Sequence, residues 1–242
     1  MGAELDDPIS EAANAALNGK TQIRLLEAGC GSASHIKLKG TVYAVGIDIS
    51  EEQLQKNTSV AEKILGDLQT YPLPHEAFDV VVCWMVLEHL PKPEAAVMNM
   101  FQATKPGGLV LLGFPHLVSF KGLVTKITPY WFHKAFYRVL KYKNRPFPTY
   151  LRAAILPKNL TRLAESNGFS VVKCHLVEGG QSRRLKKHFP PAKWALSLAN
   201  GLVRVLSLGK LDMLLDNCGL VLKKNPIETA NRDATAAASI NV

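Results

Sequence analysis

The stretch RLLEAGCGSAS, at residues 24–34, decides the fold of this chain together with YAVGIDIS at 43–50. The first apolar run ends at Glu27 and is typical of a buried parallel strand. Gly29 and Gly31 follow. They predict a turn in which the backbone passes close to a ligand, because glycine has no side chain to block the approach. We therefore expect a strand that leads directly into a ligand-binding turn.

A carboxylate at the end of the second apolar run completes the pattern. This run, 42–47, ends at Asp48, 21 positions after Glu27. In Rossmann-like sheets the turn holds one end of a nucleoside ligand and the carboxylate binds the ribose hydroxyls. The last position of the dinucleotide motif is Ser34 here, and no Lys follows the glycines as it does in a phosphate-binding loop. The pattern therefore favours a nucleoside that is neither a dinucleotide nor a nucleoside triphosphate.

The next part of the chain continues the alternation of strands and helices that an α/β sheet requires. The expected elements are a third strand ending at Gly66-Asp67, a fourth strand at 78–83, a helix at about 93–104, a turn at 105–108 and a fifth strand at 109–114. With the first turn, these elements closely resemble the class I S-adenosylmethionine-dependent methyltransferases, especially the small-molecule branch that includes quinone-biosynthesis enzymes. The resemblance covers about residues 23–116, with weaker matches at 157–178 and 218–224.

The resemblance implies an α/β fold, a doubly wound and mostly parallel sheet of seven strands with its last strand near 219–223. It also implies S-adenosylmethionine as the cofactor. Glu27, Gly29 and Gly31 match the loop that holds the methionine part, Asp48 matches the ribose ligand, and Asp67 matches the acceptor for the adenine amine. The complete set of cofactor-binding residues that we carry over is Glu27, Gly29, Cys30, Gly31, Asp48, Ile49, Asp67, Leu68, Cys83 and Trp84.

Two features depart from the family pattern. The usual third small residue of the loop is Ala33 instead of Gly, and the segment from Gly31 to Asp48 is short. We therefore expect the first helix after the loop to have only a turn or two.

The resemblance also implies two contacts to the adenine end of the cofactor. Ile49 is expected beside the adenine, and Leu68 is expected to offer a backbone amide.

Charge is distributed unevenly over the 242 residues. Residues 1–120 have a net charge of −6, residues 121–193 a net charge of +14, and residues 194–242 a net charge of +1. The basic block coincides with two expected insertions, at about 117–156 and 180–213. We expect one domain over 1–224, in which these insertions form a lid on the acceptor site, and a disordered tail at 225–242.

Three interpretations of the basic insertions remain open. The first is a lid whose lysines face water. In the second, an amphipathic basic helix within 128–150 and the segment 181–194 bind an anionic membrane or hold a lipid-linked or phosphorylated acceptor, with Arg183, Arg184, Lys186 and Lys187 as the main contacts. The third is nucleic-acid binding, although no known RNA-binding module is present. The mostly apolar helix expected at 194–208 is too short to span a bilayer, which needs about 20 residues.

An alcohol or phenol acceptor needs a base, and histidine is the usual one. His116 follows the fifth strand and is the first candidate, His133 on the expected lid is the second, and His89 after the fourth strand is the third. Tyr130 is a weaker candidate. No cluster of acidic and histidine residues has the spacing of a metal site, so we expect no metal.

The remaining expectations concern location and reaction. The four cysteines are scattered and residues 1–17 lack a continuous apolar core, so we expect reduced thiols, no signal peptide and a cytoplasmic protein, with peripheral membrane binding left open. The expected reaction is methyl transfer to oxygen of a small-molecule or lipid-linked acceptor. RNA methylation and a non-catalytic binding role are the alternatives. The acceptor atom and the oligomeric state stay undetermined at this level.

Overall fold

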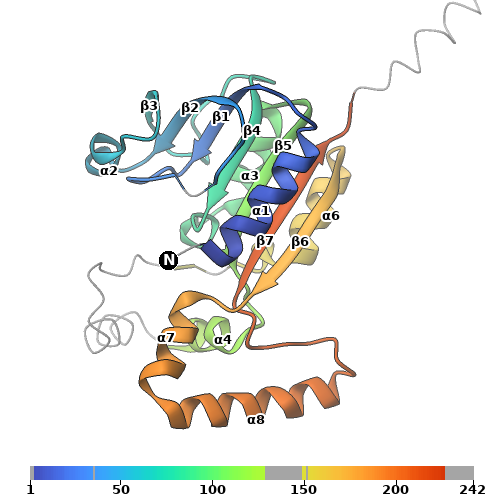
Figure 1. Cartoon of the computed structure of the whole chain (residues 1–242). Coiled ribbons are helices and arrows are strands. Elements are labelled where there is room, and N and C mark those ends of the chain that lie inside the picture. Colours follow the sequence, from blue (N-terminus) through green and yellow to red (C-terminus); the bar gives the residue numbers. More distant parts are fainter. Residues whose placement is uncertain (1–2, 35, 129–148, 151, 227–242) are drawn as a thin grey trace, which may run out of the picture.

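A seven-stranded mixed sheet forms the centre of the molecule (Figure 1). The computed structural model describes residues 3–34, 36–128, 149–150 and 152–226. The strand order is β3-β2-β1-β4-β5-β7-β6, in which β7 is antiparallel to both of its neighbours. The strands are β1 (Gln22–Ala28), β2 (Thr41–Asp48), β3 (Glu62–Leu65), β4 (Phe78–Trp84), β5 (Thr104–Pro115), β6 (Phe169–Val177) and β7 (Asn217–Lys224). The expected fold class is confirmed.

The strand order creates a switch point at the carboxyl edge of the sheet. From β1 the chain moves outward to β2 and β3, and then returns to place β4 on the other side of β1. The connection after β1 and the connection after β4 run in opposite directions, which leaves a crevice between the carboxyl ends of these two strands. Open α/β sheets bind their ligands in such a crevice. The residues that follow β1, β2, β3, β4 and β5 all lie at this edge.

Helices cover both faces of the sheet (Figure 1). One face carries α1 (Ala3–Ala16), which packs mainly on β6 and β7 and whose Ile9 and Ala13 are buried in the core of that face. The other face carries α3 (Pro93–Ala103) and α6 (Pro157–Ser166). The central strand β4 is buried along its whole length, as expected for a parallel strand with helices on both sides. The remaining helical segments are α2 (Glu51–Lys56), η1 (Leu87–His89), α4 (Phe120–Ile127), η2 (Ala153–Ile155), α7 (Gly180–His188) and α8 (Pro190–Leu206).

Three details differ from the sequence-based predictions. Among the described residues between β1 and β2, none is helical, so the expected short helix is wrong. The expected turn at 105–108 lies inside β5, where a register shift opposite Phe78–Val80 and a positive φ of 74° at Gly107 absorb the irregularity. The apolar helix expected at 194–208 begins earlier, at Pro190, and ends at Leu206.

Some predictions fall on parts of the chain that the structure does not describe. The amphipathic helix expected within 128–150, with Tyr130 and His133, lies almost entirely outside the described residues. The same holds for residues 227–242 of the expected tail. In the described part of the chain, no helix combines the length and the apolar character needed to cross a membrane.

Candidate cofactor and acceptor site

The turn after β1 has the backbone conformation that its glycines allow. Gly29 has a φ of 75° and Gly31 a φ of 50°. The Gly29 N–H donates to the carbonyl of Ile47 over 2.8 Å, which fixes the turn against β2. A Cβ atom at Gly29 would lie 2.4 Å from Val86 Cγ2, so a side chain cannot be accommodated without displacing the segment after β4. The turn and the end of β4 therefore form one tightly packed unit.

Asp48 links this turn to the end of β2. Its Oδ2 accepts a hydrogen bond from the Gly31 N–H over 2.8 Å, and its Oδ1 accepts one from the Ser50 N–H over 2.8 Å. Each carboxylate oxygen can accept two hydrogen bonds, so each retains capacity for a further donor. The carboxylate is only partly buried. This geometry fits a pair of ribose hydroxyls, and the neighbouring Ile49, 74% exposed, offers an apolar surface for a base.

Asp67 lies in the loop after β3 and is held by Gln69. Asp67 Oδ1 accepts from the Gln69 N–H over 2.9 Å, and the Gln69 side-chain amide lies within 3.1 Å of both carboxylate oxygens. Asn99 of α3 donates to the Leu68 carbonyl over 2.9 Å, while the Leu68 side chain is buried in the core. These contacts fix the loop and leave Asp67 Oδ2 with one protein donor. Asp67 and Leu68 therefore fit the adenine end of the cofactor.

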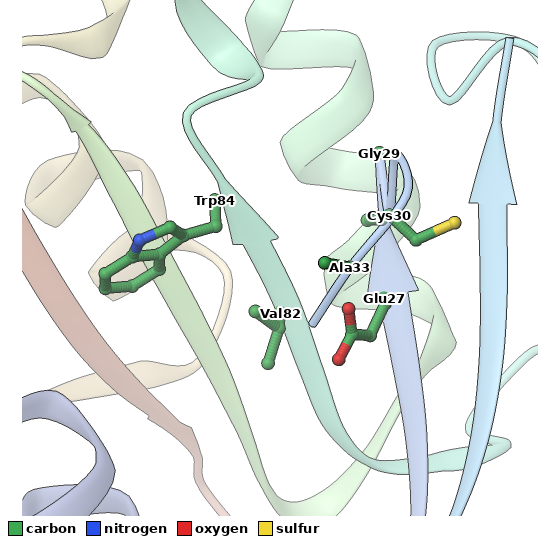
Figure 2. A pocket seen from close by; sticks show the side chains of 7 residues that line it. Glu27, Gly29, Cys30, Ala33, Val82 and Trp84 are labelled. Carbon is green, nitrogen blue, oxygen red and sulfur yellow. The ribbon is translucent and has the colours of Figure 1, made fainter. Parts of the chain in front are cut away.

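Glu27 is covered by the loop that follows the turn. Its carboxyl group is buried and accepts a hydrogen bond from the Ser34 hydroxyl. Burial raises the pKa of Glu27, and the Ser34 hydrogen bond offsets part of that shift. Figure 2 shows the Glu27 carboxyl group near Ala33 and Val82 at the cavity between β1 and β4. The cavity is about 10 Å³, room for about one water molecule.

The two cysteines of the predicted set point into the protein. The Cys30 thiol is directed toward β2 (Figure 2), and a Cβ at Gly46 would lie 2.7 Å from its Sγ. Burial, with smaller contributions from Asp48 and Glu27, raises the pKa of Cys30 to about 12. Cys83 is fully buried in the core on the α3 side, and burial raises its pKa as well. We infer that these residues can serve a cofactor through their backbone.

Trp84 and Met85 shape the end of β4. The Trp84 indole lies on β5, where a Cβ at Gly113 would come within 2.4 Å of Trp84 Cδ2. Met85 has a φ of 55° and donates its N–H to the Gly113 carbonyl over 2.7 Å. A non-glycine residue in this conformation costs on the order of 1–3 kcal/mol, and such strain is concentrated at functional sites. No local sequence signal indicates this conformation at Met85.

His116 lies directly beyond β5, at the same edge of the sheet. Its backbone N–H donates to the Asp216 carbonyl over 2.8 Å, and its Nδ1 lies 3.2 Å from the Leu215 carbonyl oxygen. A carbonyl oxygen only accepts, so the neutral imidazole carries its proton on Nδ1 and keeps the lone pair on Nε2. The ring is half-buried. This arrangement suits a fixed base.

His89 has a different environment. It lies in η1, and its Nε2 is 3.9 Å from Oε1 of the buried Glu88. Burial raises the pKa of Glu88, while His89 and Lys121 act in the opposite direction. Among the described residues, Glu88 Oε2 has no hydrogen-bond partner. Glu88 was not among the residues expected from the sequence, because only its position in the fold shows its burial.

Asp216 connects the end of β5 to the second insertion. Its buried carboxylate accepts from the Gly179 N–H and from the Ser182 hydroxyl at the start of α7, and Lys121 Nζ of α4 lies 3.8 Å from it. Its backbone carbonyl holds the N–H of His116. No local pattern indicates this role of Asp216, because Gly179 and Ser182 are 34 or more residues away from it. The candidate base and the insertion are therefore joined through one residue.

Comparison with known proteins identifies the family. The model of a methyltransferase domain family matches residues 1–223. A ubiquinone biosynthesis O-methyltransferase of Pseudomonas fluorescens is 34% identical over 98 residues, covering 36% of this chain and 42% of that protein. A protein of the same name from Coxiella burnetii is 25% identical over 182 residues, 72% of each chain. The chain aligns with less than half of the length of the first curated relatives it matches.

Solved structures share the fold at low sequence identity. A loganic acid methyltransferase crystallised with SAH superposes with a TM-score of 0.57 at 13% identity, covering 93% of each chain. The [4+2]-cyclase SpnF has a TM-score of 0.55 at 16% identity, covering 92% of this chain and 81% of that one. These two proteins show that the fold alone does not fix the reaction. The family match is the stronger result: the chain belongs to the methyltransferase domain family, with the class I fold and S-adenosylmethionine as its cofactor.

Proposed function

We propose that this protein transfers the methyl group of S-adenosylmethionine to a hydroxyl oxygen of a small or lipid-linked acceptor. The observation that carries the proposal is the hydrogen-bonded unit of Gly31, which follows β1, and Asp48, which ends β2, at the carboxyl edge of the sheet. It leaves the Asp48 carboxylate with acceptor capacity for a ribose, next to the exposed Ile49. The named activity of the ubiquinone biosynthesis relatives supports oxygen as the acceptor atom.

Each part of the cofactor has a matching group in this chain. Asp48 would hold the ribose, and Asp67 would accept from the adenine amine. The turn at Gly29 and Gly31, with Glu27 beneath it, would hold the methionine end. When bound, the cofactor supplies a methyl group that its sulfonium already activates. Because the Ser34 hydroxyl donates to Glu27 and the cavity beside them is only about 10 Å³, Ser34 would have to release the carboxyl group for the methionine end to bind.

The chain itself must position the acceptor and remove its proton. Holding the acceptor oxygen in line with the methyl group can supply a large share of the rate. His116 is the proposed base, because its Nδ1 is anchored on the Leu215 carbonyl and its Nε2 carries the lone pair. His89 and His133 remain the second choices. The insertions at 117–156 and 180–213 would cover the acceptor, since they follow the ends of β5 and β6.

A labelled-methyl assay tests this proposal. The full chain is incubated with methyl-labelled S-adenosylmethionine and, separately, with a polyprenylated phenol, the same phenol without its tail, and bulk RNA. The expected result is label transfer to a phenol, which is reduced in Asp48→Asn and unchanged in Glu62→Gln, an exposed carboxylate on β3. Transfer to RNA would identify an RNA methyltransferase. Cofactor binding without transfer to any of these acceptors would favour a non-catalytic role.

A further inference from the structure

The α8 helix presents a continuous apolar face to solvent. Its five large outward residues are between 62% and 79% exposed: Trp194, Leu198, Leu202, Val205 and Leu206. At 100° per residue they fall within an arc of about 120° on one side of the helix. Figure 1 shows α8 as the element farthest from the sheet, with α4 and α7 between them. A contiguous apolar face of this kind marks an interaction site.

The opposite side of α8 is attached to the protein. Asn200 is buried there, and its side chain donates to Asp212 over 3.0 Å and accepts from the Met213 N–H over 2.8 Å. Leu196 and Val203 are also less exposed than the five outward residues. The orientation of the helix is therefore fixed by polar contacts on one side. Its apolar side is turned away from the rest of the described chain.

The charge around this face favours an anionic partner. Between residues 179 and 211 the sequence has seven Lys and Arg residues and no Asp or Glu. Lys193, in the first turn of α8, and Lys210, just after the helix, are both exposed. Arg204 is 3.5 Å from Asp212, and its side chain is 58% exposed. Lys186 is less suitable than expected, because its amine lies 2.8 Å from Glu178 Oε1 and its side chain is mostly buried.

We propose that α8 is an interfacial helix that inserts its outward face into an anionic lipid bilayer. An amphipathic helix binds in this way when an apolar face meets the acyl chains and basic residues meet anionic headgroups. The combination favours lipid over a second copy of this chain, because the like charges of two such basic segments would repel each other. With 17 residues, α8 is too short to span the bilayer and lies along it.

The placement of α8 connects the membrane to the candidate acceptor site. Asp216 holds the start of α7 through Gly179 and Ser182, and it also holds the backbone of His116. A helix pair docked on lipid would therefore keep the carboxyl edge of the sheet close to the bilayer. This step rests on the proposed function and makes a lipid-embedded acceptor the preferred substrate class. The docking itself does not depend on methyl transfer.

Vesicle binding tests the proposal directly. The full chain is sedimented with vesicles of phosphatidylcholine alone and of an equimolar mixture with phosphatidylglycerol. We expect binding to the mixed vesicles, weakening at high salt as the charges are screened. The double variant Leu198→Gln/Leu202→Gln should bind at least about tenfold more weakly, because two exposed leucine side chains that would insert into the acyl chains are replaced by polar ones. The control Val172→Gln, at an exposed aliphatic position on β6, should bind like the wild type.

Fluorescence and cofactor binding separate the outcomes. Mixed vesicles should shift the tryptophan fluorescence emission of the wild type to shorter wavelength, and this shift should be smaller in Trp194→Phe. Failure of the wild type to sediment, or equal binding by the double variant, overturns the proposal. A wild-type dimer that the double variant makes monomeric overturns it in favour of a second copy. S-adenosylmethionine affinity, measured on the same samples, reports separately on the proposed function.

Discussion

Replacing Asp48 by Asn should weaken S-adenosylmethionine binding while leaving the fold intact. The wild-type carboxylate accepts one hydrogen bond on each oxygen from the backbone, at Gly31 and Ser50, and can accept one further bond on each. Asparagine keeps one oxygen acceptor, but its NH₂ group meets the backbone donor on the other side. The variant therefore loses the charge and one of the two positions for a ribose hydroxyl.

The expected loss follows from hydrogen bonds to a charged group. One such bond contributes about 1.5–3 kcal/mol, which corresponds to a dissociation constant about 10- to 150-fold higher. Calorimetric titration of wild type and variant with S-adenosylmethionine measures this difference. The thermal midpoint without ligand must be measured too, since the same substitution disturbs the Gly31 contact. Glu62→Gln serves as the charge-matched control.

Three results would contradict this reasoning. Equal affinity of the wild type and Asp48→Asn would show that the carboxylate does not bind the ribose. If the affinity of Asp48→Asn for S-adenosylmethionine falls only because the ligand-free variant is partly unfolded, as its lower thermal midpoint would reveal, Asp48 acts only by holding the turn. Tighter binding of NAD than of S-adenosylmethionine would contradict the assigned cofactor.

Three further predictions concern other residues. His116→Ala should lower kcat by about 10²–10⁴-fold with cofactor affinity near that of the wild type, and unchanged kcat would transfer the role to His89 or His133. Asp79→Asn should lower the free energy of unfolding by about 1–3 kcal/mol in urea titrations at neutral pH, because Asp79 is buried and bound to Lys20, Lys105 and the Arg24 N–H. Burial alone would raise the pKa of Asp79, but these hydrogen bonds outweigh burial and lower the pKa. The loss of stability in Asp79→Asn should therefore be present above about pH 4 and disappear as the pH falls through the lowered pKa. A loss of stability that does not change with pH would contradict this cause. Alkylation of the exposed Cys174 should reach half its maximal rate near pH 7, because the Cys218 thiol lowers the pKa of Cys174 to about 7. The two Sγ atoms are 3.9 Å apart. An unchanged pH profile of alkylation in Cys218→Ala would refute this cause.

The first two strands were predictable because each is a short apolar run that ends at a carboxylate, Glu27 or Asp48. The strand β4 was predictable from its continuous apolar run, which fits its burial along the whole length. The segment at 105–108 misled the prediction, because Pro and Gly favour a turn, whereas here the segment is an irregularity inside β5: Thr104 pairs with Phe78 of β4, and the pairing resumes at Leu109 opposite Val80. The N-terminal helix α1 was not predicted, since its buried face consists mainly of Ile9 and small alanines.

The candidate site was predictable only in part. Gly29, Asp48 and Asp67 follow strand ends, so their meeting at one edge follows from the topology alone. Strand alternation explains why Cys83 turns into the core on the face opposite to Val82 and Trp84. The Ser34 contact to Glu27 and the Asp216 junction depend on contacts between distant segments, which no local pattern encodes.

Single-turnover product analysis tests the central claim most directly. The full chain, in excess over methyl-labelled S-adenosylmethionine, is mixed with a polyprenylated phenol. The products are separated by chromatography, and their masses are measured by mass spectrometry. The account predicts one labelled methyl group on the phenol oxygen for each S-adenosylhomocysteine formed. Recovery of intact S-adenosylmethionine and unmodified phenol, from a protein shown to bind both, would contradict it.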